Sequence, residues 1–148
     1  MRRRARVVAM AACLGAAVAC SDLSIDPAID RITTPIANPS FSRDIEPILK
    51  ETCASSGACH SGANPPSTLN LDPDQAYASL TDSAKKVLPA ARLRVNPGFP
   101  DSSLFYVLLS DSGAARLTYY RMPLTRFPLP APIIATIRNW IANGALDN

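Results

Sequence analysis

Residues 53–60 read CASSGACH, and this octapeptide restricts the kinds of fold and functional site that the chain can form. It holds two cysteines, Cys53 and Cys59, with five residues between them, and His60 follows the second cysteine directly. His60 is the only histidine among the 148 residues. The serines and the glycine between the cysteines favour a tightly turning loop. The stretch is therefore a candidate site carried by a loop.

The order of these side chains is the order needed for covalent attachment of a haem c. Two thiols can bond the vinyl groups of the porphyrin while the adjacent imidazole reaches the iron. The spacing departs from the usual C-x-x-C-H signature. A zinc site would use Cys53, Cys59 and His60 but has no evident fourth ligand. Cysteine-protease chemistry needs a histidine from elsewhere in the fold, and the chain has none. A disulfide between Cys53 and Cys59 remains an open alternative.

Residues 1–19 have the composition of an export signal. Four arginines in the first six residues precede an apolar stretch, and small residues come directly before Cys20. The apolar stretch is too short for a permanent transmembrane helix. A cysteine at this cleavage site also resembles a bacterial lipobox. We therefore expect an exported chain, periplasmic or at the cell surface, that is anchored in the membrane by lipidation of Cys20 or secreted with that cysteine unmodified.

Removal of the leader changes the charge balance. Four of the fifteen basic residues leave and all twelve acidic residues stay, so eleven positive charges face twelve negative ones in the mature chain. The nominal charge of +3 thus belongs to the precursor alone. No basic patch for nucleic acid is expected.

Residues 20–40 predict a lipid-anchored tether, because they contain three prolines and show no helical period. Residues 41–148 then form one domain. Apolar residues at helical spacing and capping residues predict its helices. The expected helices span 41–52, 72–80, a segment from 101 or 102 to about 113, and 131–143.

The ends of these helices also have sequence signals. Ser42, Asp72, and Asp101 or Ser102 suit N-terminal caps, and Gly144 suits the C-terminal cap of the last helix. Pro47 indicates that the regular part of the first helix begins late or is kinked. Residues 87–100 should form an extended connection and 114–130 an irregular stretch. No segment alternates with period two, so the predicted class is all-α, with short helices and long proline-rich loops.

Met122 is the only methionine after the leader, and it lies in a loop just before the last helix. Ordinary core filling is the usual role of a single methionine. Beside a lone Cys-His pair, it is also the candidate second axial ligand of a haem iron. Arg121 and Arg126 are candidates to pair with haem propionates, or they are solvated surface residues.

Four motifs extend this interpretation to most of the chain. They are FSRDIEPIL at 41–49, NPGFPDSSL at 96–104, RMP at 121–123 and IRNWIANGA at 137–145. Over about residues 41–146 the chain resembles the small class I cytochrome c domains of exported bacterial lipoproteins. The resemblance implies N- and C-terminal helices packed crosswise and a haem c bound to Cys53 and Cys59, with His60 proximal and Met122 distal.

The five-residue gap between the cysteines departs from that family's spacing and leaves two, one or no thioether bonds as alternatives. With both axial positions filled by protein, the expected function is electron transfer with redox partner proteins, not substrate turnover. The alternative is a haem-free lipoprotein domain of the same fold, closed by a Cys53–Cys59 disulfide and acting in binding or assembly.

Overall fold

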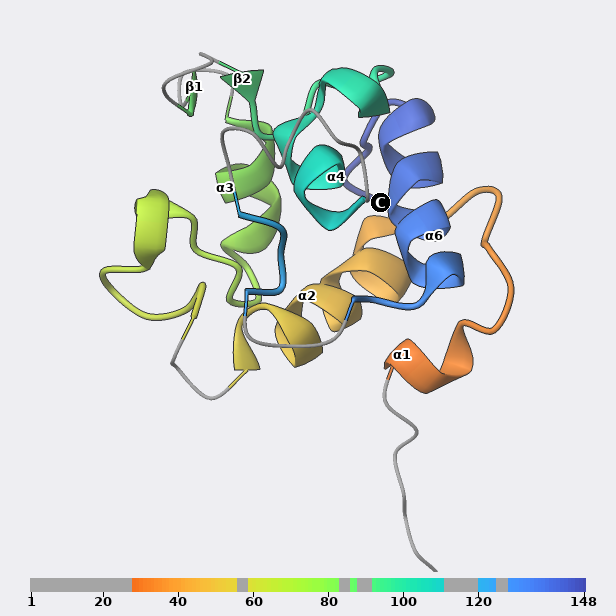
Figure 1. Ribbon diagram of the computed structural model, residues 1–148, viewed down its shortest axis with the longest axis horizontal. Helices are drawn as coiled ribbons and strands as arrows, with labels where there is room; N and C mark the ends of the chain where they lie inside the picture. Colours follow the sequence, from red (N-terminus) through yellow and green to blue (C-terminus); the bar gives the residue numbers. More distant parts are fainter. Residues whose placement is uncertain (1–27, 56–58, 83–85, 88–91, 111–119, 125–127) are drawn as a thin grey trace, which may run out of the picture.

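The computed structural model describes residues 28–55, 59–82, 86–87, 92–110, 120–124 and 128–148. Helices dominate this part of the chain, which confirms the all-α class (Figure 1). The elements in chain order are α1 (Ala28–Arg31), the π-helical turn η1 (Phe41–Ile45), α2 (Glu46–Thr52), the 3₁₀ turn η3 (Pro66–Thr68), α3 (Ala76–Thr81), β1 (Lys86–Val87), β2 (Arg92–Leu93), the 3₁₀ turn η4 (Pro100–Ser102), α4 (Leu104–Leu109) and α6 (Ala131–Ala142).

The first helical segment, η1 followed by α2, has the boundaries expected for 41–52. Its cap is Ser40 rather than the predicted Ser42: the Ser40 hydroxyl accepts a hydrogen bond from the Arg43 N–H. The regular α-helix begins only at Glu46, which places Pro47 in its first turn. Proline is tolerated there because first-turn N–H groups have no partner within the helix. The late start predicted from Pro47 is thus confirmed.

Helix α6 is the longest of the described helices and was predicted to within one residue. Its apolar face is buried, and Trp140 is 1% exposed. At its end Gly144 has a φ of +99°, while the N–H groups of Gly144 and Ala145 bond the carbonyls of Ile141 and Trp140. This is a Schellman C-cap, which confirms the role predicted for Gly144.

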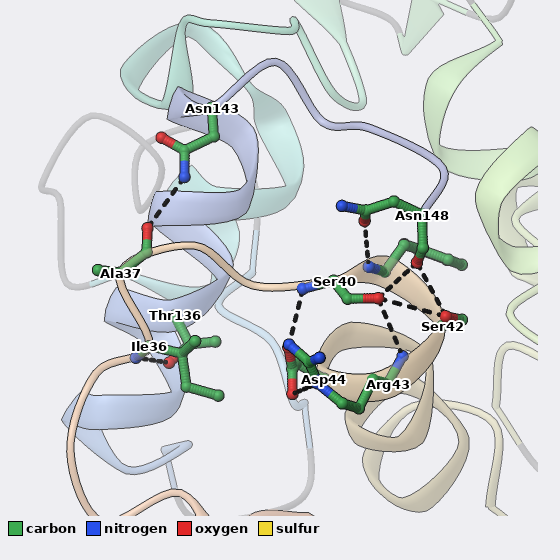
Figure 2. A network of polar contacts seen from close by, with 10 residues as sticks. Ile36, Ala37, Ser40, Ser42, Arg43, Asp44, Thr136, Asn143 and Asn148 are labelled. Atoms are coloured by element: carbon green, nitrogen blue, oxygen red, sulfur yellow. Dashed lines mark hydrogen bonds and ion pairs between the residues drawn. The ribbon is translucent and has the colours of Figure 1, made fainter.

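The segment before η1 packs against α6 (Figure 2). The Ile36 N–H donates to the Thr136 hydroxyl at 3.0 Å, and the Asn143 amide donates to the Ala37 carbonyl at 2.9 Å. Ile32 is buried in the core. Part of the segment from which the sequence predicts a tether, from Ile32 to Ser40, therefore packs against the domain.

The end of the chain completes this contact. The Phe41 N–H donates to the side-chain oxygen of Asn148 at 2.8 Å, and the Ser42 N–H donates to the Asn148 main-chain oxygen at 3.0 Å. Ser40 and Ser42 also donate their hydroxyls to that oxygen (Figure 2). We call the contact of residues 36–44 with residues 136–148 the terminal seam.

The core lies between α2, α3, α4 and α6 (Figure 1). The part of the core next to the terminal seam is aromatic. The centroid of the Phe41 ring lies 5.3 Å from that of Trp140 and 5.1 Å from that of Tyr77. The Trp140 indole donates to the Leu146 carbonyl at 2.9 Å, so its polar atom is paired. Fully buried aliphatic side chains from the helices surround these rings: Ile45, Ile48, Leu49, Leu80, Ile133, Ile137 and Ile141.

Three further local predictions were wrong. Helix α3 begins at Ala76, four residues after the predicted cap Asp72, because Asp74 between them has a φ of 66°, outside the right-handed helical region. Helix α4 begins at Leu104, and residues 100–102 form a separate 3₁₀ turn in place of a cap. The same helix ends at Leu109, where Ser110 takes an extended conformation, so it stops about four residues before the end predicted near Gly113. The 87–100 connection also contains regular structure that was not predicted, because Lys86–Val87 and Arg92–Leu93 pair as short antiparallel strands.

Candidate functional site

Cys53 lies at the C-terminal end of α2, as the sequence predicts. Its N–H donates to the Leu49 carbonyl at 2.8 Å, so its backbone continues the helix by one residue. The neighbouring Thr52 hydroxyl lies 3.2 Å from the Cys53 sulfur and donates to the Ile48 carbonyl at 2.6 Å. Burial raises the pKa of the Cys53 thiol, which is therefore protonated at neutral pH.

The cysteine loop closes on itself. The His60 N–H donates to the Cys53 carbonyl at 3.0 Å, so the chain returns to the helix end despite the five-residue gap. Both thiols are free in this structure, with Cys53 half-buried and Cys59 exposed. The arrangement thus brings the backbones of Cys53 and His60 together at the end of a rigid helix.

The half-buried imidazole of His60 faces a second turn of the chain. The ring Nδ1 lies 3.3 Å from the Leu69 carbonyl oxygen. The main-chain carbonyl of His60 accepts a hydrogen bond from the Leu71 N–H at 2.7 Å. Burial lowers the pKa of His60, and the nearby positive charge of Arg94 adds to that effect. The ring is therefore neutral at pH 7, and because a carbonyl can only accept, the contact with Leu69 favours the tautomer with the proton on Nδ1. That tautomer leaves the lone pair of Nε2 for a ligand bond.

Two polar side chains hold the loop that follows His60. The Gly62 N–H donates to the Asp72 carboxylate at 2.8 Å, and the Asn70 amide donates to the Gly62 carbonyl at 3.0 Å. Gly62 has a φ of +81°, a conformation that other residues rarely adopt. Asp72, expected to cap a helix, thus fixes the exit of the His60 loop, which we define as residues 53–72.

Met122 is half-buried against the same hydrophobic core as Cys53. Its N–H donates to the Leu108 carbonyl at 3.0 Å, which ties its loop to α4. Neighbouring Tyr120 and Leu124 are exposed. The main chain of Met122 is thus fixed to α4, and its side chain lies at the edge of the core. This position is compatible with core filling and with a ligand role. Arg121 is half-buried, whereas Arg126 and Cys20 lie outside the described residues.

One residue near the site had no role in the sequence interpretation. Arg94 is buried, and its guanidinium donates to the Ser79 carbonyl at 2.9 Å, to the Ser67 carbonyl and to the Thr68 hydroxyl at 3.2 Å. A buried arginine bound by main-chain oxygens has no sequence signature. Only its position just before the NPG motif at 96–98 could have drawn attention to it.

In the described part of the chain, no three His, Cys, Asp or Glu side chains gather as a metal-binding group, so the described residues hold no preformed zinc site. The longest described helix has 12 residues, and none of the helices described is long and apolar enough to cross a bilayer.

Comparison with protein-family models, with curated proteins and with solved structures gives no match for this chain. The functional argument therefore rests on the residues and on their geometry.

Proposed function

We propose that this protein is a monohaem c-type cytochrome domain that transfers electrons. The observation that carries the proposal is the closure of the Cys53–His60 loop, with His60 Nδ1 facing a carbonyl oxygen. Histidines that bind metals almost always donate their second ring N–H in this way. The proposal thus explains why a half-buried histidine directly follows one free cysteine and is hydrogen-bonded to the backbone of another.

The donor set fits a haem c. Cys53 and Cys59 would hold it by adding their S–H groups across the two vinyl groups, a reaction that forms thioethers and leaves no by-product. His60 would bind the iron through Nε2, and Met122 would supply a soft thioether as a second ligand. When bound, the haem would supply reversible one-electron chemistry. The protein residues hold it, orient it and exclude water from it.

Electron carriage follows from the ligand set. If His60 and Met122 both bind the iron, no coordination position is left for a substrate, so we do not propose an enzyme. Redox partner proteins would then supply and remove the electrons. We also propose export and membrane attachment through a lipid on Cys20, supported by the arginine-rich leader and the small residues before that cysteine.

A visible absorption spectrum tests the proposal. The full-length precursor is expressed in a host competent in haem attachment, beside a Cys53→Ser/Cys59→Ser variant. The proposal expects a red protein with the Soret and α bands of a low-spin c-type haem, and a colourless or weakly coloured variant. A colourless parent would overturn it. If that parent also has a mass lower by two hydrogen atoms than its reduced form, the haem-free disulfide domain is correct.

A further inference from the structure

Two consecutive residues beside His60 have a backbone conformation that side chains disfavour. Ser67 and Thr68 have φ values of 56° and 53°, in the left-handed region, although neither is glycine. Thr68 is β-branched, which makes this conformation unusual. Such residues are energetically unfavourable and persist only where surrounding contacts enforce them. Contacts with other parts of the chain must therefore hold the turn at residues 66–69 in this conformation.

Arg94 makes the contacts that can do so. One terminal nitrogen of its guanidinium donates to both strained residues, at the Ser67 carbonyl and the Thr68 hydroxyl. The other terminal nitrogen donates to the Ser79 carbonyl in α3. Arg94 is 5% exposed; its bond to Ser79 is buried, and its bonds to the exposed residues Ser67 and Thr68 are partly buried. The fork of the guanidinium suits this double attachment, which a lysine could not reproduce.

Arg94 is itself fixed from the other side. Its carbonyl accepts from the Phe105 N–H at 2.9 Å, which ties it to the buried first turn of α4. The turn that Arg94 holds leads directly to Leu69, whose carbonyl faces His60 Nδ1 at 3.3 Å. A continuous set of hydrogen bonds thus runs from α4 through Arg94 and the strained turn to the imidazole.

We propose that Arg94 is the positioning residue of the His60 imidazole: it enforces the left-handed turn that presents the Leu69 carbonyl to Nδ1. Its importance for an iron ligand rests on the proposed function. The positioning itself is a property of the chain with or without a bound group. Arg94 therefore selects the tautomer in which Nε2 can bind a metal.

The test is nitrogen-15 NMR of the histidine ring at a pH where the imidazole is neutral. His60 is the only histidine and Trp140 the only tryptophan, so one spectrum reports the tautomer and, through the indole N–H, the fold. We expect the parent to show the Nδ1–H tautomer. In Arg94→Lys and in Arg94→Gln the Nδ1–H tautomer should no longer dominate, and the two tautomers should approach their proportions in a free imidazole. Arg92→Gln, at a nearby exposed arginine, should match the parent.

A rescue separates positioning from general instability. Glycine accepts the left-handed conformation without strain, so Ser67→Gly/Thr68→Gly added to Arg94→Gln should restore the Nδ1–H tautomer. If Arg94→Gln keeps the parent tautomer with an unchanged Trp140 signal, the proposal is wrong. A second outcome also contradicts it. Here Arg94→Gln loses the Trp140 signal, and adding the two glycines brings back the Trp140 signal but not the Nδ1–H tautomer of His60. Because no haem is needed, these outcomes are independent of whether the protein is a cytochrome.

Discussion

The terminal seam and the His60 loop are built in opposite ways. At the seam, hydrogen bonds join residues about 100 positions apart in the sequence, and they flank a fully buried tryptophan. In the His60 loop, no described residue between Ala54 and Leu71 is buried, and backbone and polar side-chain bonds fix the chain. The seam resembles an ordinary protein core. The described part of the loop is held by these hydrogen bonds without a core of its own.

The largest effect should come from the seam. Trp140→Ala removes the buried ring that contacts Phe41 and the hydrogen bond to Leu146. We expect a loss of about 3–5 kcal/mol in the free energy of unfolding, measured by urea denaturation. The control is Tyr120→Ala, because that ring is 81% exposed and should change stability by less than about 0.5 kcal/mol. Equal costs for the two variants would show that the seam is not the main source of stability.

A smaller stability effect, with a distinct spectroscopic result, is expected at Met122. Met122→Ala should cost about 2 kcal/mol or less, because this side chain is only half-buried. In the haem-loaded protein it should also open the sixth position and give a high-spin spectrum. Met122→His should stay low-spin and have a lower midpoint potential, because the thioether favours ferrous iron more than imidazole does. Leu124→Ala, at an exposed neighbour, is the control.

The outcome that contradicts the ligand role is an unchanged spin state in Met122→Ala. Met122 would then only fill the edge of the core. A potential that does not fall in Met122→His would point to the same conclusion.

The smallest effect concerns the entry to the terminal seam. A hydrogen bond from Arg43, with a smaller contribution from the Ser40 N–H, keeps the pKa of Asp44 below its ordinary value. A lowered folded-state pKa stabilises the protein above the unfolded value near pH 4, and this contribution is lost as the pH falls through the folded pKa. Asp44→Asn should therefore cost about 1 kcal/mol at pH 7, because Arg43 is exposed to solvent.

The measurement is the difference in unfolding free energy between parent and Asp44→Asn from pH 7 to pH 2. We expect that difference to shrink below about pH 4. A difference that stays constant across this range would mean that the Asp44 charge contributes nothing to the seam.

The sequence predicted elements whose signals are local. Pro47 indicated the late start of α2, and Gly144 indicated the end of α6, because both residues restrict the backbone at their own positions. The contact of Ile36 with Thr136 was not predictable, since no local pattern indicates which donor meets an acceptor 100 residues away. The strained turn at Ser67 and Thr68 escaped prediction because a distant arginine enforces it.

In the candidate site, too, local sequence signals were predictable and long-range contacts were not. The CASSGACH stretch marked the residues of the candidate site, and its haem chemistry stays a prediction; the structure adds the contacts from Leu69, Asp72 and Arg94. Asp72 shows why such contacts are missed. Its sequence context is typical of a helix cap, whereas its carboxylate bonds Gly62 instead.

The most direct test of the account is the intact mass of the purified protein after denaturation and extraction with acidic organic solvent. The account predicts that haem mass remains on the polypeptide, and that peptide mapping places it on residues 53–60. Cys59→Ser should retain less haem than Cys53→Ser, because Cys59 directly precedes the proposed ligand His60. A parent that has the mass of the bare processed chain, with or without lipid, would contradict the account.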